Sequence, residues 1–492
     1  MLRVVGRAAQ VRPLVFHQLA NMHTQILSIR PETSAENPRD FGLVFSDATS
    51  PNTPLREPCQ KLAVSFTTDV AREQLTQAAL HLRAGELVAF PTETVYGLGA
   101  CALRTDAAEK IYSAKNRPAD NPLIVHTSDC DMLAQILPDG YELNPVCNAL
   151  INAFWPGPLT LLFPVGANKD GSPRVPSTVT CGQPTVGVRM PSHPIARALI
   201  ALAGVPIAAP SANASGRPSP TAAMHVFNDL GARGVLRYIV DGGECTVGVE
   251  STVVDATTVP GEVRVLRPGG ISVEQISSVL AHVHLDVRLK VYGKDLARSA
   301  DAEAAPTTPG MKYRHYSPDA RVVLVRTDGS SAQTPGFLSV LKAEATALHS
   351  AAVELLSESS TAPRAAEMIQ RRAKGPIRIG IMCASDSPLM QVLVRQSDKL
   401  LAWENSDMRI SPVVKVGPNQ VCVYSMGTLA TPAVAAQRLF DGLRTLDADV
   451  PWDDGHGFCD VIVSEVVPET GVGLAIMNRL QKAASDIVTV SC

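Results

Sequence analysis

At 492 residues the chain is too long for one ordinary hydrophobic core, and a prior of roughly 150 residues per domain leads us to expect two domains. With 45% hydrophobic and 18% charged residues, its composition is that of a globular protein, and no apolar run approaches the roughly 20 residues that a membrane span needs. The net charge of -3 excludes a strong positive potential over the whole surface, so tight non-specific binding to nucleic acid is not indicated. A local basic patch is still compatible with this net charge.

The N-terminal segment, residues 1–31, contains four arginines, and no acidic residue occurs before Glu32. This pattern resembles a mitochondrial transit peptide, and a disordered extension is the alternative. Met22 could serve as a second start that omits most of the segment. We therefore expect a cytoplasmic location, with additional mitochondrial import through the Arg-rich N-terminus as a hypothesis.

A first domain is predicted over residues 62–283. Residues 32–61 are rich in Pro, Asn, Ser and Thr without a sustained period, which predicts a flexible lead-in, with order beginning near Leu62. Strand–helix units and strand–strand units then mix, so we expect an α/β domain with a mixed twisted sheet. Apolar runs and helical periodicity predict strands at residues 87–91, 122–126, 159–165, 185–191, 206–211, 237–243, 251–256 and 263–269. Helices are predicted within residues 70–86, ending before Gly85, and at residues 106–115 and 194–204.

A linker and a second, smaller α/β domain follow. Small residues and prolines in residues 284–319 predict the linker, although its PGMKYRHYSP segment, residues 309–318, is unusually rich in basic and aromatic side chains. Residues 320–492 form the second domain, in which the Ser-, Ala- and Thr-rich stretch 327–364 is interpreted as a surface insertion. Strands are expected at residues 321–325, 378–382, 420–427 and 460–467, and helices at residues 361–373, 432–447 and 474–485.

KNRPADNPLIVH, residues 115–126, places two cations beside two prolines. Lys115 would end the preceding helix, and Pro118 biases Arg117 away from helical angles, so both cations lie between a helix exit and a strand entry. Because Pro118 and Pro122 restrict the backbone, it would lose less conformational entropy on binding a phosphate. The alternative is a pair of solvated surface charges followed by a core histidine.

Other polar segments follow or interrupt predicted strands. PTETVYGLGA, residues 91–100, offers hydroxyl groups, but its glycines match neither a dinucleotide fingerprint nor a phosphate-binding loop, and a hydrogen-bonded turn is the alternative. PSANASGRPSPT, residues 210–221, suits hydrogen bonding to a polar ligand such as a phosphate, and an ordinary turn is again the alternative. Arg189 lies in a β-patterned run and should have an anionic partner, either an internal carboxylate or a ligand. Because ligands often bind at the carboxyl ends of strands, we infer one shared cleft.

Several other chemistries fit poorly. The ten cysteines include no CxxC pair, which argues against a structural zinc site and a disulfide framework and favours reduced thiols. The sequence contains neither HExxH nor GxSxG, and no nucleophile–base pair can be named. We therefore predict no protein metal site.

Taken in order, the motifs resemble the YrdC-type domain of threonylcarbamoyl-adenylate synthases, over about residues 62–283. PGMKYRHYSP and the unit that follows it, with LFDGLR and GLAIMNRLQKAA, look like the linker and C-terminal domain of the two-domain form, whose smaller α/β domain is Rossmann-like. The motifs that carry the resemblance are PTETVYGLG, KNRPADNPLIVH, FWPGPLTLL, VGVRMPSHP, APSANASGRPSPT, VESTVVD and LRPGG.

The resemblance implies an enzyme that condenses L-threonine, bicarbonate and ATP into threonylcarbamoyl-adenylate with release of pyrophosphate, which makes it a nucleotidyltransferase. ATP is a co-substrate, Mg²⁺ is expected to bind mainly through the phosphates, and no tightly bound organic cofactor is expected. The implied downstream partner is a threonylcarbamoyl transferase, KEOPS-type or a mitochondrial equivalent, which modifies tRNA to N6-threonylcarbamoyladenosine. Direct tRNA contact would be weak, and the KYRHY linker would act as a lid.

The resemblance also assigns roles to individual residues. The catalytic set is Lys115, Arg117, Ser211 and Asn213. Threonine and the carbamate are expected near Thr92, His126, Thr185 and Arg189. ATP contacts are expected from Arg117, Asn121, Ser211, Ser219, Ser251, Arg267 and Tyr316.

Two other readings share the fold. An RNA-binding module is disfavoured by the acidic balance and by the lack of interleaved aromatic and basic residues. A carbamoyl-transfer accessory protein would be expected to carry zinc-finger-like cysteine pairs, which this sequence lacks.

Overall fold

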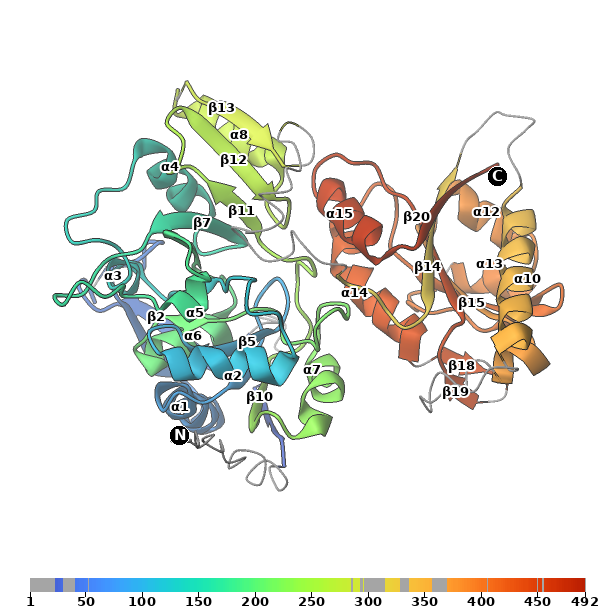
Figure 1. Cartoon of the computed structure of the whole chain (residues 1–492), viewed down its shortest axis with the longest axis horizontal. Coiled ribbons are helices and arrows are strands. Elements are labelled where there is room, and N and C mark those ends of the chain that lie inside the picture. Colours follow the sequence, from blue (N-terminus) through green and yellow to red (C-terminus); the bar gives the residue numbers. More distant parts are fainter. Residues whose placement is uncertain are drawn as a thin grey trace, which may run out of the picture.

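The computed structural model describes residues 23–29, 40–51, 53–284, 286–292, 295, 315–327, 336–355, 370–404, 406–448, 450–453 and 455–491. Two α/β units lie side by side (Figure 1). The α/β class that we predicted is confirmed, with a mixed sheet in the first unit and a smaller α/β domain as the second.

The first unit is built on a sheet of 11 strands in the order β1-β10-β4-β5-β9-β6-β8-β7-β11-β12-β13. Parallel pairs such as β6 with β8 alternate with antiparallel pairs such as β4 with β5, so the sheet is mixed. Its strands are β1 (Gln25–Ser28), β4 (Val88–Phe90), β5 (Gly97–Cys101), β6 (Val125–His126), β7 (Leu159–Pro164), β8 (Thr185–Arg189), β9 (Ile207–Ala208), β10 (Tyr238–Asp241), β11 (Thr252–Asp255), β12 (Glu262–Arg267) and β13 (Arg288–Val291).

Helices cover both faces of this sheet. One hydrophobic cluster joins Leu75 and Leu82 of α1 to Leu199 of α6, and a second cluster on the other side of the sheet contains Ile111 of α2 and Ile151 of α4. Side-chain caps set several helix starts, as where the Thr68 hydroxyl accepts from the Ala71 N–H at the start of α1. The helices are α1 (Asp69–Arg83), α2 (Thr105–Lys115), α3 (Cys130–Ala134), α4 (Pro145–Phe154), α5 (Ser177–Thr180), α6 (Pro194–Ala203), α7 (Ala223–Asp229), a 3₁₀ turn (Gly231–Arg233) and α8 (Val273–His282).

Strand β5 was missed by sequence reasoning, which treated PTETVYGLGA as a polar segment after a strand. Its glycines serve the packing of the sheet, because a β-carbon at Gly99 would lie 2.7 Å from Cε1 of Phe90. The short strand therefore passes between large neighbours that a side chain would displace.

The predicted flexible lead-in is wrong for the described residues before Leu62. Strand β2 (Leu43–Asp47) pairs antiparallel with β3 (Leu62–Phe66), and β1 adds a parallel edge to the main sheet beside β10. Leu27 and Ile29 are buried there. Residues 25–28, which we had included in the targeting segment, are thus part of the folded domain, whereas residues 1–22 lie outside the described residues.

The second unit is a parallel sheet in the order β16-β17-β15-β20-β14-β21, with only the edge strand β16 antiparallel. Side chains alternate between its faces: Val322 and Leu324 pack toward α14 and α15, whereas Val323 and Val325 pack toward α10, α12 and α13. The elements are β14 (Arg321–Thr327), α10 (Phe337–Leu355), β15 (Arg378–Cys383), α12 (Pro388–Val394), α13 (Asp398–Glu404), β16 (Val414–Val416), β17 (Asn419–Ser425), α14 (Pro432–Ala448), the hairpin β18 (Val450–Trp452) and β19 (Gly455–Gly457), β20 (Val461–Glu465), α15 (Gly473–Ala483) and β21 (Asp486–Val490).

The predicted surface insertion at 327–364 is wrong where the structure describes it. Helix α10 occupies residues 337–355, and its Phe337, Leu341 and Leu348 are buried against the sheet. The Ser- and Ala-rich composition suggested a loop, but the large apolar residues have the spacing of one face of a helix.

Helices α14 and α15 lie on the side of the second domain that is turned toward the first (Figure 1). At Gly248, with φ at +75°, a β-carbon would lie 2.3 Å from the Cα of Gln437 in α14. Glycine is therefore required for this close approach. Val95 and Val249 of the first domain are buried in one cluster with Phe440 of α14, so the interface has an apolar core.

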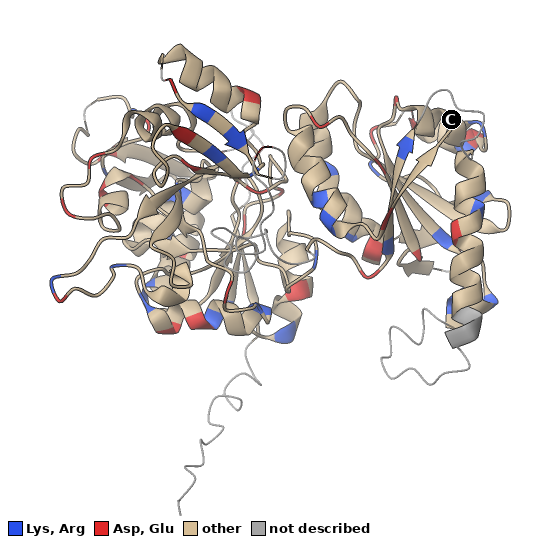
Figure 2. Ribbon diagram, turned by 45° about the horizontal axis from the view of Figure 1, so that its top comes forward, with Lys and Arg blue, Asp and Glu red and all other residues tan. Residues whose placement is uncertain are grey.

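Acidic and basic residues are interspersed over both domains (Figure 2). Among the helices of the described ranges, none is both long and apolar enough to cross a membrane.

Replacing Leu27 with Ala should lower the free energy of unfolding by about 2–5 kcal/mol, because Leu27 is 1% exposed and the substitution leaves a cavity beneath β1. Ile26→Ala is the matched control, since Ile26 is its neighbour in β1 and is 37% exposed. Urea denaturation of both variants checks this. Equal losses for the two would mean that β1 does not belong to the core in solution.

Candidate functional site

The carboxyl ends of β4, β6, β8, β9 and β12 meet at one cavity that is partly open to solvent, so the shared cleft inferred from the sequence is present. Polar and charged side chains dominate its wall. The lining residues are Thr92, Thr94, Val95, Gly97, Lys115, Arg117, Ile124, His126, Arg189, Ala209, Pro210, Ser211, Asn213, Ser215, Gly216, Arg217, Glu250, Ser251, Arg267, His315 and Tyr316.

Lys115 is the last residue of α2, where the sequence predicted the helix to end, and Asn116 follows in the left-handed conformation. Its Nζ donates to the carbonyl oxygens of Ser211, at 2.5 Å, and of Asn213, and it lies 3.5 Å from the Asn213 Oδ1. Burial, and then the neighbouring Arg117, hold the pKa of Lys115 well below its usual value. Lys115 therefore acts first as a clamp on the Ser211–Asn213 turn, and a direct contact with a phosphate would displace the 3.5 Å interaction.

Arg117 is held by the turn that follows it. Its Nε and Nη2 donate to the carbonyl oxygen of Asn121, at 3.3 and 3.2 Å, and Nη2 also reaches the carbonyl oxygen of Pro122. The hydroxyl of Tyr112 donates to the same Asn121 oxygen. Backbone carbonyl groups of the turn thus orient the guanidinium on the cavity wall.

The turn after β9 is stabilised by its own side chains. The Ser211 hydroxyl donates to the Asn213 Oδ1 at 2.5 Å, and the Asn213 amide donates to the carbonyl oxygens of Ala214 and Arg217. The Ala214 N–H donates to the buried carboxylate of Asp229 at 3.1 Å. Ser211 and Asn213 are thereby positioned beside Lys115 on one wall.

At the other end of the cavity, Arg189 has an internal carboxylate partner, which is one of the two kinds of anionic partner that the sequence left open. It forms a buried ion pair with Glu93 at 2.5 Å and donates to the Thr94 hydroxyl at 2.8 Å. The Thr94 hydroxyl is in turn 2.8 Å from that of Thr92. Arg189 is thus restrained by groups that together form a polar wall.

His126 pairs with Arg189 across β6 and β8 and is buried. Burial, and then the charge of Arg189, lower the pKa of His126 to about 3. The imidazole is therefore neutral at physiological pH. In this site it can accept or donate a hydrogen bond but does not act as a cation.

A second charged group surrounds Glu250. Its carboxylate accepts from the Ser219 hydroxyl at 2.8 Å and from the Arg479 Nε at 2.9 Å. Burial alone would raise the pKa of Glu250, but Arg479, Arg267 and the Ser219 hydroxyl together lower it to about 2. Glu250 is therefore a carboxylate, and with burial it raises the pKa of Tyr316 to about 12.

Arg267 ends β12 and donates to Ser251, the residue before the neighbouring strand β11. Its Nη2 lies 2.9 Å from the Ser251 carbonyl oxygen and 3.2 Å from the Ser251 hydroxyl. That hydroxyl is also 2.8 Å from the hydroxyl of Thr160. Arg267 and Ser251 therefore form one hydrogen-bonded unit on the cavity wall.

Most of the predicted site residues line the cavity, and the exceptions are instructive. Asn121 supports Arg117 through its backbone carbonyl, and Ser219 supports Glu250, so neither is in the lining. Thr185 starts β8, about 13 Å from Arg189 at the other end of the strand, and does not line the cavity, so its assignment to the threonine site stays a prediction. The predicted residues that do line the cavity are Thr92, Lys115, Arg117, His126, Arg189, Ser211, Asn213, Ser251, Arg267 and Tyr316.

Sequence reasoning also missed members of the site. Thr94 and Glu250 lie near strand ends within motifs that it had quoted, and Arg217 lies within the PSANASGRPSPT segment, so each could have been proposed from its motif. His315 lines the cavity beside Tyr316, whereas the preceding Lys312, Tyr313 and Arg314 of the linker lie outside the described residues.

Chemically, this site can bind and polarise an anion. Cationic side chains and hydroxyl donors face the cavity, while the nearby carboxylates of Glu93 and Glu250 are paired with arginines. Within the part of the chain that the structure describes, no three His, Cys, Asp or Glu side chains gather as a protein metal site would require. Positioning and electrostatic stabilisation are the chemistry that this donor set supplies.

Two family models match the chain. Residues 81–269 match a family described as "Telomere recombination", the Sua5/YciO/YrdC family, and residues 271–485 match "Threonylcarbamoyl-AMP synthase, C-terminal domain". Threonylcarbamoyl-AMP synthase of Bacillus subtilis is 40% identical over 84% of this chain and 93% of its own length. The protein of the same name from Schizosaccharomyces pombe is 39% identical over 88% of this chain and 94% of its own length.

A solved structure is also similar over nearly the whole chain. The crystal structure of Pyrococcus abyssi Sua5 complexed with L-threonine superimposes with a TM-score of 0.62 at 32% sequence identity, covering 95% of this chain and 100% of that one. Both domains are therefore included in the likeness.

The buried Glu250 should make stability depend on pH. Its pKa is about 2 in the folded chain and 4.5 without the fold, so the stability it contributes is complete above about pH 4.5 and is lost as the pH falls toward 2. The stability difference between wild type and Glu250→Gln should shrink by roughly 2 kcal/mol from pH 6 to pH 3. Urea denaturation at each pH measures it.

Glu109→Gln, which replaces an exposed carboxylate of α2, is the control, and its difference from wild type should stay nearly constant over this range. A constant difference for Glu250→Gln as well would contradict the assigned ion pair with Arg479.

Proposed function

The chain belongs to the threonylcarbamoyl-AMP synthase family in its two-domain form, and we propose that it condenses L-threonine, bicarbonate and ATP into threonylcarbamoyl-AMP with release of pyrophosphate. The observation that carries the proposal is the single cavity in which Lys115, Arg117, Arg189 and Arg267 converge. Such a site suits a reaction whose substrates are all anionic or carry a carboxylate. The RNA-binding and carbamoyl-transfer readings are not favoured, since relatives that match over most of the chain are synthases.

The reaction, a nucleotidyl transfer, has two bond-forming steps. The threonine amine attacks bicarbonate and forms a carbamate with loss of water. A carbamate oxygen then attacks the α-phosphorus of ATP, and the bond to pyrophosphate breaks. Negative charge is concentrated on phosphate oxygens throughout, so fixed donors stabilise the transition state more than a protein nucleophile would.

The geometry supports a division of the cavity into two ends. Arg117, Arg267 and the Ser211–Asn213 turn would bind the nucleotide and its phosphates. Arg189, with the hydroxyls of Thr92 and Thr94, would receive the carboxylate and hydroxyl of threonine, and neutral His126 would lie beside them. Holding both substrates in one cavity converts an encounter of separate molecules into a reaction between neighbours.

Mg²⁺ is proposed to bind through the ATP phosphates with water completing its coordination, and when bound it would neutralise phosphate charge. The donors on the cavity wall are hydroxyls, amides and cations, which suit the phosphate oxygens that the ion leaves exposed. No tightly bound organic cofactor is part of the proposal.

The linker is proposed to act as a lid that excludes water from the mixed anhydride product. His315 and Tyr316 line the cavity, and the ring of Tyr316 lies 5.2 Å from that of Phe440 in α14. This contact joins the lid to the second domain.

Outside the site, the proposed recipient of the product is a threonylcarbamoyl transferase that modifies tRNA, KEOPS-type or a mitochondrial equivalent. A cytoplasmic location with additional mitochondrial import is also proposed. A start at Met22 would support both locations, because β1 begins at Gln25 and either start retains it.

The proposal predicts that the purified chain forms an AMP-containing product that carries the label of ¹⁴C-bicarbonate only when ATP and L-threonine are both present. Serine in place of threonine should give much less product. Chromatography of the reaction, together with pyrophosphate release, measures this. Nucleotide turnover that ignores threonine and bicarbonate would refute the synthase assignment.

Arg117→Ala should lower kcat/KM about 10- to 100-fold in this assay, because a hydrogen bond to a charged group is worth about 1.5–3 kcal/mol. Arg104→Ala is the matched control. Arg104 makes an exposed ion pair with Asp106 at the other end of α2, so its loss should leave the rate nearly unchanged. Near-normal activity of Arg117→Ala would remove Arg117 from the site.

A further inference from the structure

Two arginines of the second domain extend into the first domain behind the cavity wall. Arg444 belongs to α14 and is 8% exposed, and Arg479 belongs to α15 and is completely buried. Guanidinium groups removed from water at a domain interface are costly unless each is fully paired. Their partners should therefore be parts of the first domain whose position matters.

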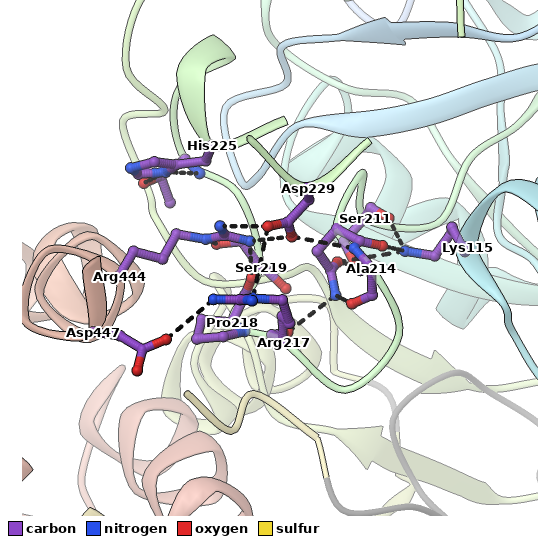
Figure 3. Close-up of polar contacts among 12 residues, drawn as sticks. Lys115, Ser211, Ala214, Arg217, Pro218, Ser219, His225, Asp229, Arg444 and Asp447 are labelled. Carbon is purple, nitrogen blue, oxygen red and sulfur yellow. Dashed lines mark hydrogen bonds and ion pairs between the residues drawn. The ribbon is translucent and has the colours of Figure 1, made fainter. Parts of the chain in front are cut away.

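Arg444 is paired with a carboxylate and with two backbone carbonyls. Its Nη1 and Nη2 donate to the two carboxylate oxygens of Asp229 at 3.2 and 2.8 Å. Its Nε donates to the carbonyl oxygen of Ser219 at 3.3 Å, and Nη2 also donates to that of Pro218. Figure 3 shows this guanidinium between Asp229 and the Pro218–Ser219 backbone. Arg444 therefore holds the last residues of the PSANASGRPSP segment from outside the first domain.

Arg479 reaches the same segment through Glu250. Its Nε donates to one carboxylate oxygen of Glu250, and the Ser219 hydroxyl donates to the other. Arg479 also donates to the carbonyl oxygen of Pro268, next to Arg267. The two arginines thus converge on Ser219, one at its carbonyl and one through its hydroxyl.

The 210–219 segment is held at both ends by cations. Lys115 of the first domain holds the carbonyl oxygens of Ser211 and Asn213, and Asp229 holds the Ala214 N–H while pairing with Arg444 (Figure 3). A segment rich in Ser, Gly and Pro has little apolar surface of its own to order it. Its conformation therefore depends on these polar contacts, and the two contacts to the carbonyl oxygens of Pro218 and Ser219 come from Arg444 of the second domain.

We propose that Arg444 and Arg479 are positioning residues of the nucleotide pocket, through which the docked C-terminal domain fixes the 210–219 segment and Glu250 in the arrangement that binds ATP. The proposal rests on the proposed function only in taking ATP as the ligand of this pocket. Neither arginine lines the cavity, so both act through Ser219, Glu250 and Asp229. The threonine end is built on contacts among Arg189, Glu93 and Thr94, and these differ from the contacts that Arg444 and Arg479 make.

The test uses full-length Arg444→Met, with Arg409→Met as matched control. Arg409 also joins the two domains, through an ion pair with Glu244 at 2.7 Å, but this pair is exposed, and its other ion-pair partner, Asp441, belongs to its own domain. KM for ATP should rise about 10- to 100-fold in Arg444→Met while KM for threonine changes less than about threefold, because breaking a buried pair is far more costly than breaking an exposed one. Arg409→Met should retain both values.

Calorimetric titration with a non-hydrolysable ATP analogue provides a second readout that needs no catalysis. If the wild type binds the analogue but makes no product, the proposed function fails while the positioning role is still tested. If the wild type is active and Arg444→Met binds the analogue normally, the positioning role alone is overturned. Equal increases in both KM values would also overturn it, since they would indicate a general loss of structure.

Arg444→Lys keeps the experiment decisive if the Met variant does not fold. A lysine can pair with Asp229 but cannot reach both backbone carbonyls with a planar fork. The affinity of Arg444→Lys for the analogue should therefore be lower than that of the wild type but higher than that of Arg444→Met. Its melting temperature should be near that of the wild type. Wild-type affinity in Arg444→Lys would contradict the role of the Pro218 and Ser219 contacts. Arg479→Lys, measured in the same way, should weaken ATP binding without changing KM for threonine, and an unchanged ATP affinity would remove Arg479 from the proposal.

Discussion

Buried cations that are matched by oxygen atoms determine the form of this protein around its cavity. Lys115, Arg189, Arg444 and Arg479 are each less than a tenth exposed, and each is paired with carboxylate or carbonyl oxygens. Because an unpaired buried charge costs several kcal/mol, the backbone that supplies these oxygens is restrained as strongly as the cations themselves. The cavity wall is thereby ordered before any substrate arrives.

This arrangement gives the second domain a role in the site without placing its side chains in the cavity. Helices α14 and α15 bury apolar residues against their own sheet and also present arginines to the first domain. The apolar contact around Phe440 and the close approach at Gly248 bring the helices near enough for those arginines to reach Ser219 and Glu250. Packing between the domains is therefore coupled to the electrostatics of the cavity through the contacts of Arg444 with Ser219 and of Arg479 with Glu250.

Much of the fold could be predicted from local patterns. The end of α2 at Lys115 followed from Pro118, and the strands that carry His126, Arg189 and Arg267 followed from their apolar runs. Errors arose where a polar composition gave no sign of a strand or helix. Residues 40–61 appeared too polar to be ordered, yet they contain β2, which pairs with β3. Helix α10 was masked in the same way by its Ser- and Ala-rich surroundings. Such segments are ordered by distant partners, which no local window contains.

The sequence by itself determined that polar and basic residues lie at the ends of strands in an α/β domain, and the order of its motifs indicated the family. Only the tertiary structure decided which of these residues share a cavity and which support it from behind. Thr185 and Arg189 lie in one strand, yet only the residue at its carboxyl end faces the site. Ser219, which was expected to contact ATP, links Glu250 to Arg444: its hydroxyl donates to a carboxylate 31 residues away in the chain, and its carbonyl accepts from a guanidinium 225 residues away. The identity of a residue restricts the chemistry it can perform, but the atoms it meets depend on long-range packing.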